Sequence, residues 1–437
     1  MNPPLYFLAK RALSEPSCPL KARQAFNRAF ARARLGSPTR AELGVGPNES
    51  NSDSGFEARL ELDSTRLLNN INKPSSAHPK PGSPGSITAL GELLPKLSWL
   101  DLSSNSITGR IPHSIGMLKE LGVLVLGNNS LSGKLSLHWK DLQQLKILDL
   151  ADNNILGNAT SSMRHLCSLK VFSLHQNQLE GELSPFFRNY RNLRNLDLGR
   201  NKFFGKLLAQ IGESLPYLLR LSLRSNLFHR NIPQQLCLLS QLQILDLAYN
   251  HFLGAIPQCL GNLSRDDNGE ADYEEQMLLV SKGRENLYGG SIIGLVYSLD
   301  LSSNNLSEEI PNNITTISKL INMNLSMNNL SGSIPEKIGN LHMLESLDLS
   351  MNELYGHIPK SMSSLTFLSH LNLLFNNLYG KILSGNQLQT LNDSSIYEGN
   401  SLVCRPPLST KCSENKTKSR VTPKHHGDKL TFEALII

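Results

Sequence analysis

A pattern of leucines and asparagines recurs about every 24 residues from Leu97 onward, and it constrains the fold more than any other feature of the sequence. Eleven copies carry an x-L-x-L core followed by an asparagine, and many continue into a glycine and an Ile-Pro pair. The fourth position of each copy falls at 100, 124, 148, 172, 196, 221, 245, 299, 323, 347 and 371. Regular self-similarity at such a period predicts stacked repeats and not an ordinary globular domain.

Each recurrent position of the repeat has a structural role. The x-L-x-L core alternates with a period of two, so the leucines lie on one face of a short strand. A single coil cannot bury that face alone, so neighbouring coils stack and share one continuous core. An asparagine amide after the strand is predicted to satisfy backbone groups that the inward turn would bury. These asparagines are Asn105, Asn129, Asn153, Asn177, Asn201, Asn226, Asn250, Asn304, Asn328, Asn352 and Asn376.

The pattern resembles the leucine-rich repeat, and its L-x-G-x-I-P segment resembles the plant-type variant. The resemblance implies an α/β solenoid: a horseshoe or superhelix with a concave parallel β-sheet, and mostly β, irregular and 3-10 structure on the convex side. With strands about 4.8 Å apart, eleven coils extend roughly 50 Å. A surface of that kind is suited to holding another macromolecule.

The array is interrupted once. The step from position 245 to position 299 is 54 residues in place of 24, and the repeat then resumes in phase, so residues 266–295 are predicted to form an island loop. Its acidic first half is predicted to be solvated, whereas its second half, with MLLV and SIIGLV, is expected to dock on the coils.

The remaining boundaries are a basic, Pro/Ser-rich segment over 1–90, repeats over 91–265 and 296–388, a cap over 389–412 and a basic, disordered tail over 413–437.

Charge and motifs exclude several functions. The net charge of +6 arises from residues 1–40, with a balance of +7, and residues 413–430, with +3, so the main body is slightly acidic and is not predicted to bind nucleic acid. No nucleophile constellation, phosphate loop or metal-finger spacing is present. The paired His425 and His426 are interpreted as solvated. The chain is therefore predicted to be non-enzymatic and to need no cofactor or metal.

Cysteines and sequons point to a secreted chain. Cys404 and Cys412 flank a Pro-rich loop and are predicted to close a cap by a disulfide, which implies an oxidising compartment. For Cys237 and Cys259, in consecutive coils, a bridge and two buried thiols both remain open. Ten N-x-S/T sequons occur, some generated by the repeat itself. The predicted glycosylation sites are Asn128, Asn158, Asn262, Asn305, Asn313, Asn324, Asn329 and Asn392.

Outward-facing strand positions are the candidates for recognition. A recurrent aspartate at the fifth position of the copy, between the two leucines of the core, is too regular to specify a ligand and is interpreted as scaffold. It occurs as Asp101, Asp149, Asp197, Asp246, Asp300 and Asp348. The middle coils vary more, and arginine and tyrosine are frequent interface anchors. The predicted ligand-binding residues of the concave face are His175, Arg200, Arg220, Arg224 and Tyr249. The alternative, that these five are ordinary solvated side chains without a role in recognition, is weighted equally.

Residues 97–412 resemble the C-terminal half of a plant leucine-rich-repeat receptor-like protein. The resemblance is carried by the plant-type repeat, the MLLVSKGRE interruption, the four repeats after it and the cap GNSLVCRPPLSTKC, in which Val403 and Arg405 depart from the family pattern. It implies an extracellular ectodomain at the cell membrane, a single membrane span, and signalling in defence or development through partner receptor kinases. In several members a Lys-x5-Tyr motif in the interruption is linked to co-receptor recruitment, so Lys282 and Tyr288 are the predicted co-receptor residues.

Two other functions compete with a receptor that binds a protein, peptide or glycan ligand. One is a secreted enzyme inhibitor similar to the polygalacturonase-inhibiting proteins, which lack an interruption. The other is a non-functional receptor fragment or decoy. No signal-peptide core and no apolar run of about 18 residues is found in the sequence, so we expect a receptor portion that is truncated at both ends.

Overall fold

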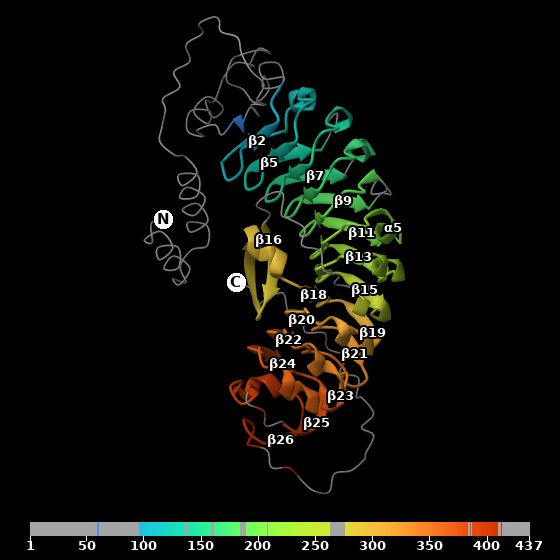
Figure 1. Ribbon diagram of the computed structural model, residues 1–437, viewed down its shortest axis with the longest axis vertical. Coiled ribbons are helices and arrows are strands. Elements are labelled where there is room, and N and C mark those ends of the chain that lie inside the picture. Colours follow the sequence, from blue (N-terminus) through green and yellow to red (C-terminus); the bar gives the residue numbers. More distant parts are fainter. Residues whose placement is uncertain are drawn as a thin grey trace, which may run out of the picture. The chain divides into compact units, whose positions relative to one another are not determined.

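The computed structural model describes residues 59–60, 96–135, 139–158, 161–183, 189–207, 209–262, 276–382, 385, 387–409 and 412. The chain divides into two compact units, residues 1–202 and 203–437. Each unit is a stretch of repeat solenoid, in which successive coils add short parallel strands to a sheet (Figure 1). Apart from 59–60, the predicted segment 1–90 and the tail 413–437 lie outside the described residues.

In the first unit the coils stack through three-residue strands paired in parallel. For example, Leu100 is the partner of Leu124, and Leu148 that of Phe172. These strands are β2 (Trp99–Asp101), β4 (Val123–Val125), β6 (Ile147–Asp149), β8 (Val171–Ser173) and β10 (Asn195–Asp197), and β1 (Arg59–Leu60) pairs with β2. A second parallel ladder holds β3 (Thr108–Gly109), β5 (Ser130–Lys134), β7 (Asn154–Asn158) and β9 (Gln178–Glu182). The 3-10 helices are η2 (His113–Met117), η3 (Trp139–Asp141) and η4 (Ser161–His165).

The second unit repeats this plan. Its first ladder holds β12 (Arg220–Ser222), β14 (Ile244–Asp246), β18 (Ser298–Asp300), β20 (Asn322–Asn324), β22 (Ser346–Asp348) and β24 (His370–Asn372). Beside it lie β11 (Lys202–Lys206), β13 (Leu227–Asn231), β15 (His251–Gly254), β19 (Asn305–Glu309) and β21 (Asn329–Ser331), then β23 (Tyr355–His357), β25 (Asn377–Lys381) and β26 (Leu402–Cys404). The helices are α5 (Gln210–Ser214), η6 (Gln234–Leu238), η7 (Gln258–Asn262), η9 (Asn312–Thr316), η10 (Ile338–Asn340), η11 (Lys360–Ser364) and η12 (Ser394–Tyr397).

The predicted solenoid of parallel strands and 3-10 turns is confirmed. Each of the eleven predicted repeat positions is the central residue of a strand, with its side chain buried in the core. The asparagine ladder also behaves as expected. Asn250 Nδ2 donates to the carbonyl oxygens of Leu223, Leu247 and Ala248 at 2.9–3.1 Å, and its Oδ1 accepts from the Phe228 N–H at 3.1 Å. One side chain thus satisfies backbone groups of two consecutive coils.

The recurrent aspartate is a scaffold residue, as interpreted. In each coil that carries it, one carboxylate oxygen accepts the backbone N–H two residues later, at 2.9–3.1 Å. This bond holds the turn that follows the strand. The aspartates involved are Asp101, Asp149, Asp197, Asp246, Asp300 and Asp348.

The stack of coils in the second unit continues without a gap across the interruption. Ile244 and Leu245 of β14 pair with Ser298 and Leu299 of β18, although 51 residues separate the two strands. On the helical side η7 packs against η9, and Thr316 Oγ1 donates to the carbonyl of Gly261 at 2.7 Å. The described residues 276–295 are therefore an insertion that lies outside the stack.

Two disulfides join described cysteines. Cys404 and Cys412 are bonded, with Cα atoms 5.2 Å apart, and so are Cys237 and Cys259, with Cα atoms 5.7 Å apart. Of the two alternatives for Cys237 and Cys259, the structure contains the bridge, which ties η6 to η7 of the next coil. Cys167 is a free, exposed thiol.

We expect peptide mapping of the unreduced protein from a secretory host to recover Cys237 linked to Cys259 and Cys404 linked to Cys412. An alkylating reagent is expected to label Cys167 before reduction, because its sulfur is exposed and unbonded. A sample reduced in denaturant is the control, in which all six cysteines of the chain react. Labelling of Cys237 or Cys259 without reduction would contradict the pairing.

Candidate recognition site

The second half of the interruption is a β-hairpin. Strand β16 (Gln276–Ser281) pairs antiparallel with β17 (Arg284–Gly289), and η8 (Gly290–Leu295) leads back to the coils. Lys282 and Gly283 form the two-residue turn with φ of 55° and 70°. Two left-handed residues are the requirement of a tight hairpin turn, and the Lys-Gly pair supplies a glycine at one of them.

One face of this hairpin is buried against the coils. Met277 and Leu279 alternate along β16 and are almost fully buried. They pack with Ile244 of β14, with Ile293 and Val296, and Tyr288 packs against the same cluster. Met277 and Leu279 of MLLV and Ile293 and Val296 of SIIGLV thus provide the docking surface. Burial of such side chains stabilises the seated hairpin by about 1.5–3 kcal/mol each.

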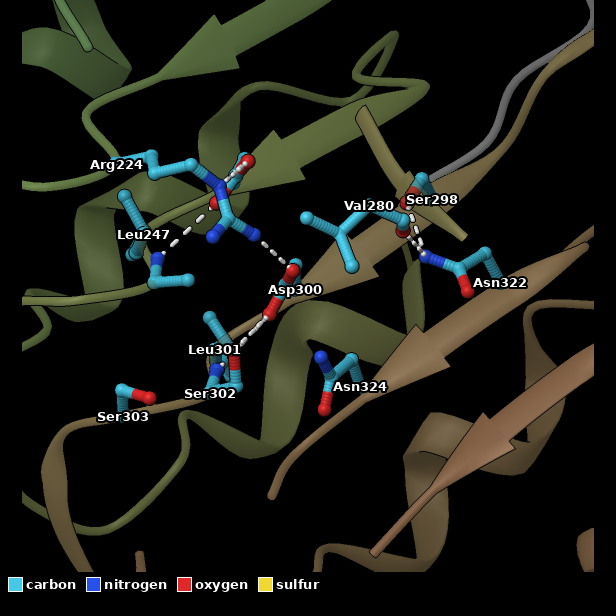
Figure 2. A network of polar contacts seen from close by, with 12 residues as sticks. Arg224, Leu247, Val280, Ser298, Asp300, Leu301, Ser302, Ser303, Asn322 and Asn324 are labelled. Atoms are coloured by element: carbon cyan, nitrogen blue, oxygen red, sulfur yellow. Dashed lines mark hydrogen bonds and ion pairs between the residues drawn. The ribbon is translucent and has the colours of Figure 1, made fainter. Parts of the chain in front are cut away.

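Polar contacts fix the hairpin along three consecutive strands. Asn322 Nδ2 donates to the carbonyl of Val280 at 2.8 Å and to Ser298 Oγ at 2.9 Å (Figure 2). At the tip, the Lys282 N–H donates to Ser346 Oγ at 3.2 Å, and Lys282 Nζ lies 2.8 Å from Glu345 Oε2. Ser298, Asn322 and Ser346 are the first residues of β18, β20 and β22. The hairpin therefore lies across the N-terminal ends of these strands, on their outward face.

Beside the hairpin lies a buried charge network centred on Arg224. The Arg224 side chain donates through Nε to Asp246 Oδ2 at 2.7 Å and through Nη2 to Asp300 Oδ2 (Figure 2). Arg224 is only 4% exposed, and both aspartates are 2% exposed. Asp246 precedes the insertion in sequence and Asp300 follows it. Arg224 thus holds together the two coils between which the hairpin emerges.

The network has one carboxylate more than it has cations. Burial and the neighbouring Asp246 raise the pKa of Asp300, against the opposing effects of Arg224 and Ser302, to about 6. For Arg224, burial lowers the pKa but the two carboxylates raise it by more, so the guanidinium stays charged. The guanidinium also lies 5.3 Å from the centre of the Tyr249 ring.

The five predicted ligand-binding residues fall into two groups. In the first unit, His175 is buried with Nδ1 3.4 Å from Asp197 Oδ1, and Arg200 Nη1 donates to Gln176 Oε1 at 3.1 Å. Burial lowers the pKa of His175, but Asp197 raises it by more, so the net shift is upward. In the second unit, Arg220 and Arg224 are buried and Tyr249 is exposed. That these residues bind a ligand stays a prediction, and for Arg224 the structure provides a structural role.

The two predicted co-receptor residues lie at opposite ends of the hairpin. Lys282 is at the tip with its side chain 46% exposed, whereas Tyr288 is at the base, paired with Met277. At about 3.3 Å per residue they are roughly 20 Å apart, so the structure does not bring them together. Sequence reasoning missed the partners of the tip, Glu345 and Ser346, because they lie in a distant coil that only docking places beside Lys282.

The predicted glycosylation sites differ in accessibility. Asn158, Asn305, Asn313, Asn329 and Asn392 are exposed, whereas Asn128 and Asn324 are partly buried. Asn324 Oδ1 accepts from the N–H and hydroxyl of Ser326 at 3.1 and 2.7 Å. The Asn262 side chain lies outside the described residues. Modification at all these positions stays a prediction.

Within the described part of the chain, no group of three or more His, Cys, Asp or Glu residues is arranged to hold a metal ion. Over the same residues, no helix has the length and apolar character that a membrane crossing requires.

Comparison with known proteins relates this geometry to plant receptors. The leucine rich repeat family matches residues 96–118, 241–263, 296–317, 319–341 and 343–365. Receptor-like protein 43 of Arabidopsis thaliana is 33% identical over 122 residues, which cover 25% of this chain and 17% of that protein's length. A TDR receptor crystal structure aligns with a TM-score of 0.50 at 29% identity, covering 68% of this chain and 54% of that one. A plant ice-binding protein shares the fold at 24% identity and a TM-score of 0.50, covering 72% and 84%.

Proposed function

Because the chain is a leucine-rich-repeat protein related to plant receptor-like proteins, we propose that it is a non-enzymatic recognition protein of the cell-surface type. In this proposal the coils bind an extracellular protein, peptide or glycan ligand. A partner receptor kinase binds as co-receptor, and the assembly acts in defence or developmental signalling at the extracellular face of the cell membrane. The similarity to Receptor-like protein 43 and to the TDR receptor supports the proposal.

The seated hairpin is the observation that carries this proposal. The stacked coils do not require an inserted hairpin for their own packing. Met277 and Leu279 nevertheless anchor the hairpin against the sheet. Its opposite face presents Leu287, and the following η8 presents Ile292 and Leu295, all exposed. An anchored element with an exposed apolar face is suited to a protein partner. The hairpin also distinguishes this chain from inhibitors of the polygalacturonase-inhibiting type, which lack an interruption.

The proposal gives the two ends of the hairpin different roles. Lys282 offers a cationic tip to the co-receptor, and Tyr288 sets the angle of the hairpin base through its packing on the coils. Ligand contacts are proposed for His175, Arg200, Arg220 and Tyr249, with Arg224 positioning Tyr249 from beneath its ring.

Replacing Lys282 with alanine is expected to weaken binding of the full chain to a plant receptor-kinase ectodomain by about tenfold, because a partly exposed ammonium at an interface is lost. Binding is measured by surface plasmon resonance against a panel of such ectodomains. Folding is expected to change little, since the Lys282–Glu345 ion pair is about half exposed on both sides and such pairs contribute about 0–1 kcal/mol.

Glu345→Gln is the matched control for this experiment. It removes the same ion pair but leaves the ammonium in place, so binding is expected to be retained. Equal loss in both variants would mean that the anchored tip, and not the charge, matters to the partner. Unchanged binding of Lys282→Ala and of Tyr288→Ala to every ectodomain that binds the wild type would contradict the co-receptor role of the hairpin.

A further inference from the structure

One backbone position in every coil is left-handed. It immediately precedes the ladder asparagine and has φ between 49° and 57°. Its occupants are Ser104, Asn128, Asp152, Gln176, Arg200, Ser225, Tyr249, Ser303, Met327, Met351 and Phe375. Asparagine and aspartate tolerate this conformation best among residues with a Cβ, and for bulky side chains it is uncommon. The fold itself does not require a large residue there, because serine occupies the position in three coils.

Three consecutive coils of the second unit nevertheless place large apolar residues at this position. Met327 is 43% exposed, Phe375 is 49% exposed and Met351 between them is partly exposed. Their coils are neighbours in the parallel ladder, so the side chains follow one another at about 4.8 Å intervals. These coils thus combine an unfavourable backbone conformation with exposed apolar surface. Strain that the fold does not need, at an exposed position, indicates a functional demand.

Acidic residues lie close to Met351 and Phe375. Glu353 follows Met351 by two residues and is exposed, and Asp348 of the same coil is partly exposed. The Phe375 N–H donates to the carbonyl of Glu398 at 2.7 Å, which places a further exposed acid beside the ring. An apolar row bordered by carboxylates complements apolar groups bordered by cations.

We propose that Met327, Met351 and Phe375 form an apolar stripe that binds a segment of a partner protein carrying apolar side chains flanked by lysine or arginine. Methionine side chains adapt to irregular apolar partners, and the phenylalanine supplies a rigid anchor. The stripe extends the proposed recognition function to a second surface. The hairpin lies over the first residues of β20 and β22, whereas the stripe follows the ends of the same strands and stays uncovered.

The test uses the full chain and two pools of synthetic twelve-residue peptides, identical in apolar content. One pool flanks the apolar residues with lysine and arginine, the other with aspartate and glutamate. The triple variant Met327→Ser, Met351→Ser, Phe375→Ser is expected to bind the basic pool at least tenfold more weakly than the wild type. Its melting temperature is expected not to fall, because serine is the residue that Ser104, Ser225 and Ser303 provide at this position.

A matched control comes from the same coils. Met343 and Phe367 are as exposed as the stripe residues but lie before their strands, so Met343→Ser with Phe367→Ser is expected to leave peptide binding unchanged. Equal binding of the acidic and basic pools, no binding of either, or equal loss in this control overturns the proposal. A lowered melting temperature of the triple variant also overturns it, because the stripe would then be structural.

Two other occupants of the stripe are distinguished by one further variant, Asn329→Gln, and by sedimentation of the same samples. If the glycosylated wild type binds only after Asn329→Gln, a glycan covers the stripe and the proposal fails. It also fails if sedimentation shows a dimer that the triple variant abolishes, because a second copy is then the occupant. Binding of receptor-kinase ectodomains by the triple variant reports on the hairpin separately, so failure of the stripe leaves the proposed function standing.

Discussion

Replacing Arg224 with alanine is expected to lower the free energy of unfolding at pH 7 by about 3–5 kcal/mol, the cost of breaking a buried ion network by removing one partner. Asp246 and Asp300 are each 2% exposed, and without the guanidinium two carboxylates remain buried side by side. The loss is expected to be concentrated in the second unit. Urea denaturation of the full chain, followed by circular dichroism, measures it.

The control variant adds Asp246→Asn and Asp300→Asn to Arg224→Ala and is expected to recover most of the lost stability. The chain itself shows that asparagine suits this strand position, because Asn324 accepts the Ser326 N–H and hydroxyl as the aspartates of other coils do. If Arg224→Ala alone changes stability by less than about 1 kcal/mol, the network is not the structural clamp described above.

The second large effect concerns pH. Asp300 has its pKa raised from 3.8 to about 6 by burial and by Asp246, so the folded protein binds a proton there more tightly than the unfolded chain does. The contribution of Asp300 to the free energy of unfolding is therefore fully present below about pH 4, where the group is protonated in both states. It is lost as the pH rises through about 6, because the folded protein must then bury the ionised carboxylate. At roughly 1.4 kcal/mol per pKa unit, the difference reaches up to about 3 kcal/mol.

The measurement compares the wild type with Asp300→Asn in urea denaturation between pH 4 and pH 7. On acidification from pH 7, the wild type is expected to gain stability relative to the variant, which lacks the titrating group. Carboxylates remote from the Arg224 network titrate alike in both proteins and cancel in the difference. A constant difference across this range, or a change in the opposite direction, contradicts an Asp300 that takes up a proton near pH 6.

Both predictions bear on how the recognition surface is built. Arg224 was expected among ligand contacts, because arginine at an outward strand position is a frequent interface residue. The structure instead buries it under Tyr249 and between two coils that the insertion separates in sequence. Its effect on recognition is therefore expected to be indirect, through the ring of Tyr249 and the point at which the hairpin leaves the stack.

The sequence by itself determined the coils. Positions such as Leu245 and Asn250 could be assigned because every coil presents the same environment to the same repeat position, so a local pattern specifies both the buried strand and the ladder that follows it. The scaffold role of the aspartates followed for the same reason. Their partner is a backbone N–H only two residues away, a contact that needs no information about distant segments.

Only the tertiary structure decided where the interruption sits and what surrounds it. Lys282 meets Glu345 and Ser346 more than sixty residues later in the chain, and Arg224 reaches Asp300 across the whole insertion. Such contacts depend on how an aperiodic segment docks, and a repeat pattern carries no information about a segment that occurs once. The periodic residues thus specified the scaffold, whereas burial and charge pairing between distant coils specified which side chains remain available for recognition.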